Sequence, residues 1–277
     1  MFTMAVLQSA ARINAVTENL ERIAMFAQKA ASRGADLLVT PELFTTGYAP
    51  GLVKHSDGEM IRAELARIAR QQGIALVGSS VEAAGSDLHI CASLFDDQGN
   101  ELTRYRKAHL FGPDEKAAFA PGNTLPELVP YRGLTLALGL CYDIEFPEYA
   151  RSAAVRGADV LCIPTAVPTT GDVGGATPGL TYNAERISTM MVPVRALENG
   201  AYIAYANHSA PGFTGLSCIA SPYGTFLDAA GGGEELLIAE IDEAEVRRAR
   251  KINTYLDCVR TDLYSPQRSP AALSQLS

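Results

Sequence analysis

The stretch "RGADLLVTPE" at residues 33–42 returns as "RGADVLCIPT" at residues 156–165, and this repeat decides the fold class. Each copy enters a short apolar run that a proline interrupts. Apolar spacing predicts a helix before the first copy, beginning near Thr17. A second helix is predicted before the other copy, beginning at Pro147, because proline is favoured at the first helical position. The repeat therefore predicts two similar α/β halves.

The likeness between the halves continues along the chain. Residues 73–80 and 200–209 each form an apolar run after a second predicted helix, over 60–72 and 183–199, and each leads into a predicted hairpin. The hairpin turns fall at 97–100 and 221–224. Two mixed sheets with helices on one face of each predict a four-layer α-β-β-α sandwich. No linker separates the halves, so residues 1–277 are predicted to form a single domain.

Composition narrows the class of protein. Of 277 residues, 47% are apolar and 19% charged, which is enough for a large core and gives no sign of disorder. The net charge of −8, without a basic run, argues against nucleic acid or an anionic membrane as a partner. No apolar run approaches the roughly 18 residues that span a bilayer. Five scattered cysteines without a C-x-x-C pair argue against disulfides and a zinc site, and favour the cytoplasm.

Three chemically complementary residues stand at predicted strand ends. Glu42 closes one apolar run, Lys107 closes "ELTRYRK" and Cys141 closes "LTLALGLC". Ligands of open α/β sheets collect at the carboxyl ends of strands, so an acid, a cation and a thiol at these positions indicate a site.

Cys141 is either a small buried apolar residue or a nucleophile. It begins a turn where the backbone N–H groups of Tyr142 and Asp143 would face an oxyanion. Nearby carboxylates should raise its pKa, so reactivity requires a cation or a base elsewhere. The four histidines form no Cys–His signature, which leaves a papain-like mechanism unsupported. Asp143 and Glu148 are expected to have structural roles, such as capping the helix that begins near Pro147.

Each remaining candidate also has two interpretations. Glu42 is a capping or surface residue, or a general base whose pKa desolvation raises toward neutrality. Lys107 is a surface lysine, or the cation that holds a thiolate and later an oxyanion. Glu115 taken alone reads as a solvated acid in a loop.

Four motifs in order supply a resemblance. The segments "PELFTTGY" (41–48), "YRKAHLF" (105–111), "DEKAAFAPG" (114–122) and "GLCYDIEFPE" (139–148) resemble the nitrilase, or carbon–nitrogen hydrolase, superfamily. The likeness covers about residues 1–242, and the order of the motifs makes it specific. It implies the α-β-β-α sandwich already predicted from the repeat.

The resemblance also implies a mechanism without a metal or organic cofactor. It implies a triad of Cys141, Glu42 and Lys107, with Glu115 positioning the substrate and assisting proton transfer. The implied reaction is hydrolysis of a small aliphatic amide through a cysteine thioester. The oxyanion would be held by Lys107 and the backbone N–H of Tyr142.

The wording of the motifs is most similar to that of bacterial 5-aminopentanamidases. Relatives that cleave ω-amides of dicarboxylic acids often carry arginine at the position of Glu145. An acid facing the pocket would favour a cationic amine tail, although a structural salt bridge explains Glu145 equally well. Tyr48, Thr165 and Ala166 are further candidates for the substrate pocket. The Gly-rich stretch 168–187 is longer than expected and bears on the substrate more than on the reaction.

Other functions remain open at this point. An N-carbamoyl amine or N-carbamoyl amino acid hydrolase would use the same four residues and release carbon dioxide with ammonia. A nitrile hydrolase is less consistent with "CYDIEFPE". An inactive binding scaffold of the same fold would not need all four polar residues. The motifs of metal, P-loop and serine hydrolases are missing.

The C-terminal tail at 254–277 shows no clear periodicity. It is expected to pack on the surface or on a partner subunit. The superfamily commonly pairs its subunits, so the resemblance implies a homodimer or a larger homo-oligomer.

Overall fold

The computed structural model describes residues 1–169, 173–174, 181–209 and 211–264. The elements of the first half are β1 (Phe2–Gln8), α1 (Val16–Ser32), β2 (Leu37–Val39), α2 (Pro50–Val53), α3 (Gly58–Gln72), β3 (Ala75–Ala84), β4 (Asp87–Phe95), β5 (Glu101–Arg106) and α4 (Gly112–Ala118). Those of the second half are β6 (Leu128–Tyr131), β7 (Leu134–Leu138), the 3-10 turn η1 (Cys141–Glu145), α5 (Pro147–Val155), β8 (Val160–Pro164), β9 (Val173–Gly174), β10 (Thr181–Tyr182), the π turn η2 (Ile187–Met191), α6 (Val192–Asn199), β11 (Tyr202–Ala206), β12 (Cys218–Ala220), β13 (Phe226–Ala229), β14 (Glu235–Ile241), α7 (Glu243–Ile252) and α8 (Thr261–Tyr264).

The two halves repeat one sheet topology. One six-stranded sheet has the order β14-β1-β2-β3-β4-β5, and the other has the order β6-β7-β8-β11-β12-β13. In each sheet the second, third and fourth strands are parallel, and the remaining pairings are antiparallel. The predicted pseudo-repeat and both predicted hairpins are confirmed.

The aspartate of the repeated motif explains why the sequence recurs. Asp36 accepts a hydrogen bond of 2.8 Å from the backbone N–H of Thr3, and its own N–H donates to the Thr3 carbonyl at 2.7 Å. Asp159 makes the same pair of bonds with Thr135, at 2.9 and 2.8 Å. In each half, the motif therefore fixes the register between the first parallel strand and the strand that follows its helix.

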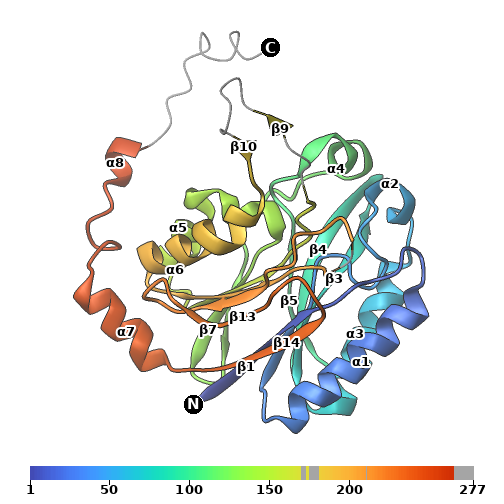
Figure 1. The fold of residues 1–277 in the computed structure, drawn as a ribbon, viewed down its shortest axis with the longest axis horizontal. Helices are drawn as coiled ribbons and strands as arrows, with labels where there is room; N and C mark the ends of the chain where they lie inside the picture. Colours follow the sequence, from blue (N-terminus) through green and yellow to red (C-terminus); the bar gives the residue numbers. More distant parts are fainter. Residues whose placement is uncertain (170–172, 175–180, 210, 265–277) are drawn as a thin grey trace.

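Three apolar clusters define four layers. One cluster lies between the two sheets, with Val6 and Val77 from the first sheet and Leu136 and Ala204 from the second. A second packs α1 and α3 against the outer face of the first sheet, and a third packs α5 and α6 against the second. Figure 1 shows these helix layers on opposite sides of the paired sheets. The predicted α-β-β-α sandwich is confirmed.

Two features were not anticipated from the sequence. Strand β14 follows the second half in the chain but pairs antiparallel with β1 of the first sheet, so it links the halves covalently and by hydrogen bonds. The helix expected over 183–199 contains the π turn η2 before α6. The tail is described as far as Tyr264, and the rest of the predicted segment 254–277 lies outside the described residues. Within the described chain, no helix is long and apolar enough to cross a membrane.

Candidate active site

Glu42 lies in the turn after β2, where both sheets hold its backbone. Its N–H donates to the carbonyl of Thr165, which follows β8 of the second sheet, at 3.2 Å. Its carbonyl accepts a hydrogen bond of 2.7 Å from Nε2 of His208, which follows β11. The side chain is fully buried, and Oε1 accepts from Nζ of Lys107 at 2.8 Å. The other oxygen, Oε2, is buried and has no hydrogen-bond partner in the described part of the chain.

Lys107 and Glu115 complete a buried ion cluster. Lys107 directly follows β5, is fully buried, and donates through Nζ to Oε1 of Glu115 at 2.8 Å as well as to Glu42. Glu115 lies in the first turn of α4, where its Oε2 accepts from the backbone N–H of Phe111 at 2.8 Å. The hydroxyl of Tyr48 donates to its Oε1 at 2.6 Å. One ammonium is thus shared by two carboxylates away from solvent.

Cys141 begins η1 immediately after the second sheet's β7 and Gly139-Leu140. Its φ of 45° lies in the left-handed region, which is unfavourable for a residue with a side chain. The backbone N–H of Tyr142 lies in the first turn of η1, where a helical turn itself supplies no acceptor. The nucleophile candidate and a backbone donor therefore share one strained turn.

The charges of the cluster set the resting protonation states. Burial raises the pKa of Glu42 to about 7, against the lowering effect of Lys107. Burial raises the pKa of the Cys141 thiol, and the charge of Glu42 raises it further. Burial alone would lower the pKa of Lys107, but nearby negative groups, Glu42 first among them, raise it above its ordinary value. At rest the site therefore holds a thiol and an ammonium. The charge of Lys107 is engaged by the two glutamates, and the prediction that it holds a thiolate stays a prediction.

His208 is a buried residue of the site that the sequence did not single out. Burial lowers its pKa to about 4, and its ring stacks between Phe44 and Phe213, with centroids at 5.7 and 4.9 Å. Because Nε2 faces the carbonyl of Glu42, the neutral ring donates there and supports the turn. Nothing in the sequence around His208 signals this contact, since it joins residues 166 positions apart.

A small pocket opens beside the sulfur. Its volume is about 20 Å³, close to the space that one water needs. It is lined by Phe111, Cys141, Glu145, Ala166, Val167, Pro168, Tyr182, Ala184 and Ile187. Four of these residues belong to the stretch 168–187, of which 170–172 and 175–180 lie outside the described residues.

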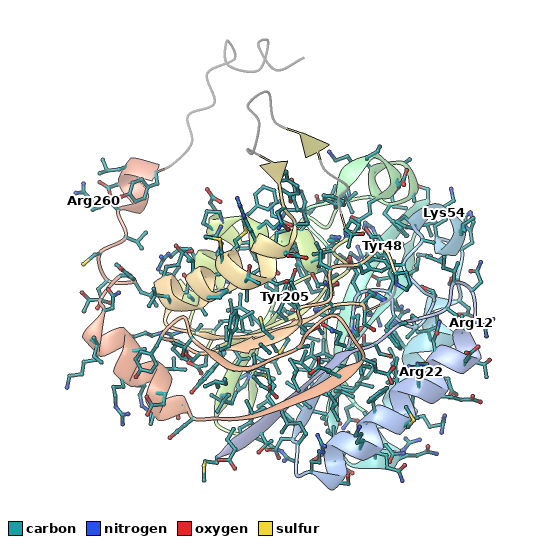
Figure 2. All side chains as sticks on the ribbon, in the orientation of Figure 1. Arg12, Arg22, Tyr48, Lys54, Tyr205 and Arg260 are labelled. Carbon is teal, nitrogen blue, oxygen red and sulfur yellow. The ribbon has the colours of Figure 1, made fainter. Side chains whose placement is uncertain are left out.

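The other predicted pocket residues divide into two groups. Glu145 and Ala166 line the pocket, whereas Tyr48 contacts Glu115 and Thr165 anchors the backbone of Glu42. The side chain of Thr165 also lies near the sulfur, since it is among the groups that lower the pKa of Cys141. Tyr205 lies between the second sheet and its helices, near the same sulfur (Figure 2).

The predicted structural role of Asp143 is confirmed, but the residue does not cap α5. Helix α5 has no side-chain cap on its first turn, and its cap position is Phe146. Asp143 is fully buried and directs both oxygens to other partners, because donors from β5 and from the turn before η1 converge on it. Glu148 lies exposed in the first turn of α5.

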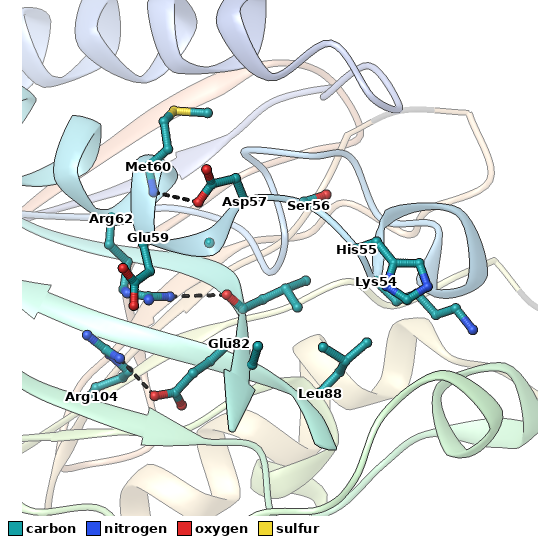
Figure 3. Close-up of a pocket in the computed structure, with 13 residues that line it drawn as sticks. Lys54, His55, Ser56, Asp57, Glu59, Met60, Arg62, Glu82, Leu88 and Arg104 are labelled. Carbon is teal, nitrogen blue, oxygen red and sulfur yellow. Dashed lines mark hydrogen bonds and ion pairs between the residues drawn. The ribbon is translucent and has the colours of Figure 1, made fainter. Parts of the chain in front are cut away.

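A larger cavity of about 540 Å³ lies at the start of α3 (Figure 3). Its polar lining is largely satisfied internally: Arg104 pairs with Glu82 at 2.8 Å, and Arg62 donates to the carbonyl of Val81 at 3.1 Å. None of the four predicted catalytic residues lines it. We therefore assign the chemistry to the smaller pocket beside Cys141. Among the residues that the structure describes, no cluster of His, Cys, Asp or Glu has the composition of a metal site.

The fold and this site agree with the comparison to known families. The carbon-nitrogen hydrolase family matches residues 3–251 of the chain. The chain therefore belongs to the carbon–nitrogen hydrolase family, in the amidase branch of the nitrilase superfamily.

Particular relatives agree with this placement. The chain is 30% identical to 2-oxoglutaramate amidase of Bacillus subtilis, over 95% of this chain and 99% of that protein. It is 34% identical to a Pseudomonas protegens protein described as a hydrolase in the pqqF 5′ region, over 94% and 90%. The amidase of Nesterenkonia sp. AN1 superposes with a TM-score of 0.83 at 36% identity, covering 95% of this chain and 98% of that one. Acrylamide adds to the active-site cysteine of a mutant of that amidase.

Replacing Lys107 with methionine should destabilise the fold in a pH-dependent way. Removing one partner from a buried ion cluster is expected to lower the free energy of unfolding by about 3–5 kcal/mol near pH 8. The loss should shrink toward pH 5. A buried carboxyl whose pKa is higher in the folded than in the unfolded state destabilises the folded protein as the pH rises. At pH 5 Glu42 can take up a proton, so the variant no longer buries an unpaired carboxylate at that position. Urea unfolding at both pH values measures the effect.

The matched control is Lys116→Met, which changes an exposed lysine next to Glu115. This variant should unfold like the wild type at both pH values. An equal loss of stability for Lys107→Met at pH 5 and pH 8 would contradict the shared-cation interpretation.

Proposed function

We propose that the protein hydrolyses a small aliphatic amide to a carboxylic acid and ammonia through a thioester on Cys141. The observation that carries the proposal is the buried ammonium of Lys107, bound at 2.8 Å by both Glu42 and Glu115 near a strained cysteine. Residues of the two sheets meet there, and the partnerless Oε2 of Glu42 is available to accept a proton. Amidase relatives support the reaction class.

The first half of the reaction forms the thioester. Oε2 of Glu42 takes the thiol proton as the sulfur of Cys141 attacks the amide carbonyl, which forms the C–S bond. The carbonyl oxygen becomes an oxyanion that Lys107 and the backbone N–H of Tyr142 stabilise. Loss of one such donor commonly costs about 3–4 kcal/mol of transition-state stabilisation. Protonated Glu42 then gives its proton to the departing nitrogen, the C–N bond breaks, and ammonia leaves.

The second half releases the acid. A water gives a proton to Glu42 and attacks the thioester, and the oxyanion is held as before. When the C–S bond breaks, the proton returns from Glu42 to the sulfur and restores the resting thiol. Glu115 keeps the ammonium of Lys107 aimed and, in our proposal, orients the amide nitrogen. A carboxyl with a pKa of about 7 suits both directions of proton transfer.

For the substrate, we propose an amide with a cationic amine at its far end, such as 5-aminopentanamide. Glu145 lines the same pocket as Cys141, and burial raises its pKa to about 7 despite the charges of Lys107 and Arg195. Arg195 itself is engaged, because it pairs with Glu198 at 3.2 Å and donates to the backbone carbonyls of Ile144 and Glu145. No lysine or arginine is among the described residues that line this pocket, and a carboxylate in such a pocket favours a cation.

One alternative substrate class has specific support from the relatives. Relatives named omega-amidase and 2-oxoglutaramate amidase favour an ω-amide of a dicarboxylic acid. The carboxylate of Glu145 disfavours a second carboxylate in the pocket. An N-carbamoyl amine would fit the same four residues and release carbon dioxide along with ammonia. An inactive scaffold would not need the strained Cys141 beside a buried ion cluster.

Replacing Cys141 with alanine should abolish ammonia release while leaving the fold intact. The side chain is the only nucleophile in the proposed mechanism, so turnover should fall to background. The measurement is ammonia release over a panel of amides and N-carbamoyl compounds, with circular dichroism as the test of folding. Mass spectrometry of the wild type with a slow amide should show an acyl mass gain at Cys141. An active alanine variant would refute the thioester, and carbon dioxide release would favour the carbamoyl alternative.

Glu145 should make the preference for 5-aminopentanamide depend on pH. Its ionised fraction rises as the pH increases through about 7, while the substrate amine stays protonated. The ratio of kcat/KM for 5-aminopentanamide to that for pentanamide should therefore rise between pH 6 and pH 8. This ratio cancels the titration of Glu42, because both substrates use the same base.

The matched variant is Glu145→Gln, which should lower that ratio about tenfold, or about 1.4 kcal/mol, and remove its pH dependence. Activity on pentanamide should be retained. Glutaramate is the third substrate, and a clear preference of the wild type for glutaramate would refute the cationic substrate in favour of an ω-amide.

We also propose that the chain forms a homodimer or a larger homo-oligomer. Support comes from exposed apolar side chains on the α5–α6 layer and the adjoining β12–β13 hairpin, including Val155, Val194, Leu197 and Phe226. Sedimentation velocity at micromolar concentration should give at least a dimer mass, and Leu197→Glu should shift it toward the monomer. A monomeric wild type would contradict this proposal.

A further inference from the structure

Asp143 is a fully buried carboxylate that the proposed chemistry does not use. It lies two residues after Cys141 in η1, and its two oxygens accept four hydrogen bonds. Oδ1 accepts from the backbone N–H of His109 at 3.0 Å and contacts Nδ1 of the same residue at 2.7 Å. Oδ2 accepts from the Tyr105 hydroxyl and from the backbone N–H of Leu140, each at 3.0 Å.

These partners flank two reacting groups. Tyr105 and His109 lie two residues before and two residues after Lys107, and Leu140 directly precedes Cys141. The Tyr105 hydroxyl also accepts a hydrogen bond of 3.1 Å from the backbone N–H of Ala108. The residues on both sides of Lys107 are therefore bound to Asp143, either directly or through Tyr105. The carboxylate thus joins the end of β5 in the first sheet to the nucleophile turn of the second.

Aromatic packing reinforces the same connection. The ring of His109 stacks on Phe146, which ends η1, with centroids 4.0 Å apart and planes 15° apart. The ring of Tyr105 packs against Tyr149 of α5 at 5.8 Å. Contacts on both sides of Asp143 therefore hold the lysine segment against the cysteine segment.

The hydrogen-bond pattern requires a carboxylate. The backbone N–H groups of His109 and Leu140 can only donate, so each oxygen of Asp143 must accept, and the His109 ring donates as well in the tautomer that carries its proton on Nδ1. An asparagine would replace one of the two oxygens with an N–H₂ group, which would then face hydrogen-bond donors. A glutamate would add a methylene to a site with no exposed surface.

We propose that Asp143 is a positioning residue that sets the separation between the Lys107 ammonium and the Cys141 sulfur. Since the oxyanion must lie within reach of both the ammonium and the turn that carries the sulfur, this separation determines how well it is held. The inference rests on the proposed function for its kinetic consequence, but the geometry can be tested without turnover. The alternative is a purely structural tie whose loss lowers stability alone.

The experiment compares Asp143→Asn with Asp159→Asn in the full chain. Asp159 is a matched control, because it also accepts a backbone N–H of the second sheet, from Thr135 at 2.9 Å, but at the opposite end of β7. Three quantities are measured for each variant: kcat and KM with a hydrolysed amide, the pH profile of Cys141 alkylation by iodoacetamide, and the urea midpoint.

Asp143→Asn should lower kcat about 100-fold with little change in KM, because misplacement of a reacting group by about 1 Å has effects of that size. It should also shift the alkylation profile. Asp159→Asn should lower the urea midpoint but leave kcat and the profile close to those of the wild type. Unchanged kcat and an unchanged profile in Asp143→Asn, or equal changes in the two variants, would overturn the inference.

Two further results keep the test decisive. If Asp143→Asn does not fold, Tyr105→Phe removes only one of the four donors and should still lower kcat about tenfold and shift the alkylation profile. Its control is Tyr131→Phe, since the buried Tyr131 hydroxyl has no hydrogen-bond partner among the described residues. Equal behaviour of these two variants would overturn the inference. If the wild type hydrolyses no amide, the proposed function fails, while the alkylation profile alone still decides the role of Asp143.

Discussion

The buried ammonium of Lys107, shared by Glu42 and Glu115, is the interaction on which the rest of the site depends. Removing three charges from water is expensive, and such a cluster persists only when every charge has close partners. Here the partners come from the ends of β2 and β5 and from the first turn of α4. The cluster therefore forms only when the first sheet, its helices and the following loop are all in place. Tyr48 and the backbone of Phe111 satisfy the remaining positions on Glu115.

The second sheet brings the nucleophile to this cluster, and the sandwich fixes how the two meet. The carbonyl of Thr165 and the ring of His208 hold the backbone of Glu42 from the second sheet. Asp143 connects the turn that carries Cys141 to the end of β5. Contacts from both sheets thus stabilise a left-handed cysteine that would be unfavourable in isolation. The strain is tolerated because the surrounding hydrogen bonds determine the turn completely.

The two buried glutamates near Cys141, Glu42 and Glu145, have similar pKa values but different surroundings. Glu42 and Glu145 both have a pKa raised to about 7 by burial, but only Glu42 is bound to the ammonium. In our proposal, one moves protons at the reacting carbon and the other recognises the far end of the substrate. Lys107 lowers the pKa of the Cys141 thiol, but burial and the charge of Glu42 raise it more. In our proposal the thiol therefore loses its proton as it attacks the substrate. Family membership supports the reaction class, and in our proposal the environment of Glu145 separates the candidate substrates.

The sequence by itself determined the α/β halves, the hairpins and the strand ends that carry Glu42, Lys107 and Cys141, because periodicity, turn residues and the repeated motif are local signals. The four motifs also sufficed for the family. Only the tertiary structure decided the crossing of β14 to the first sheet, the burial that raises the pKa of the thiol and the partners of Asp143. Aspartate before a helix reads locally as a cap, yet two of its partners, Tyr105 and His109, lie 38 and 34 residues away. The burial and the electrostatics of a site depend on contacts between residues far apart in the sequence. A short stretch of sequence therefore does not determine them.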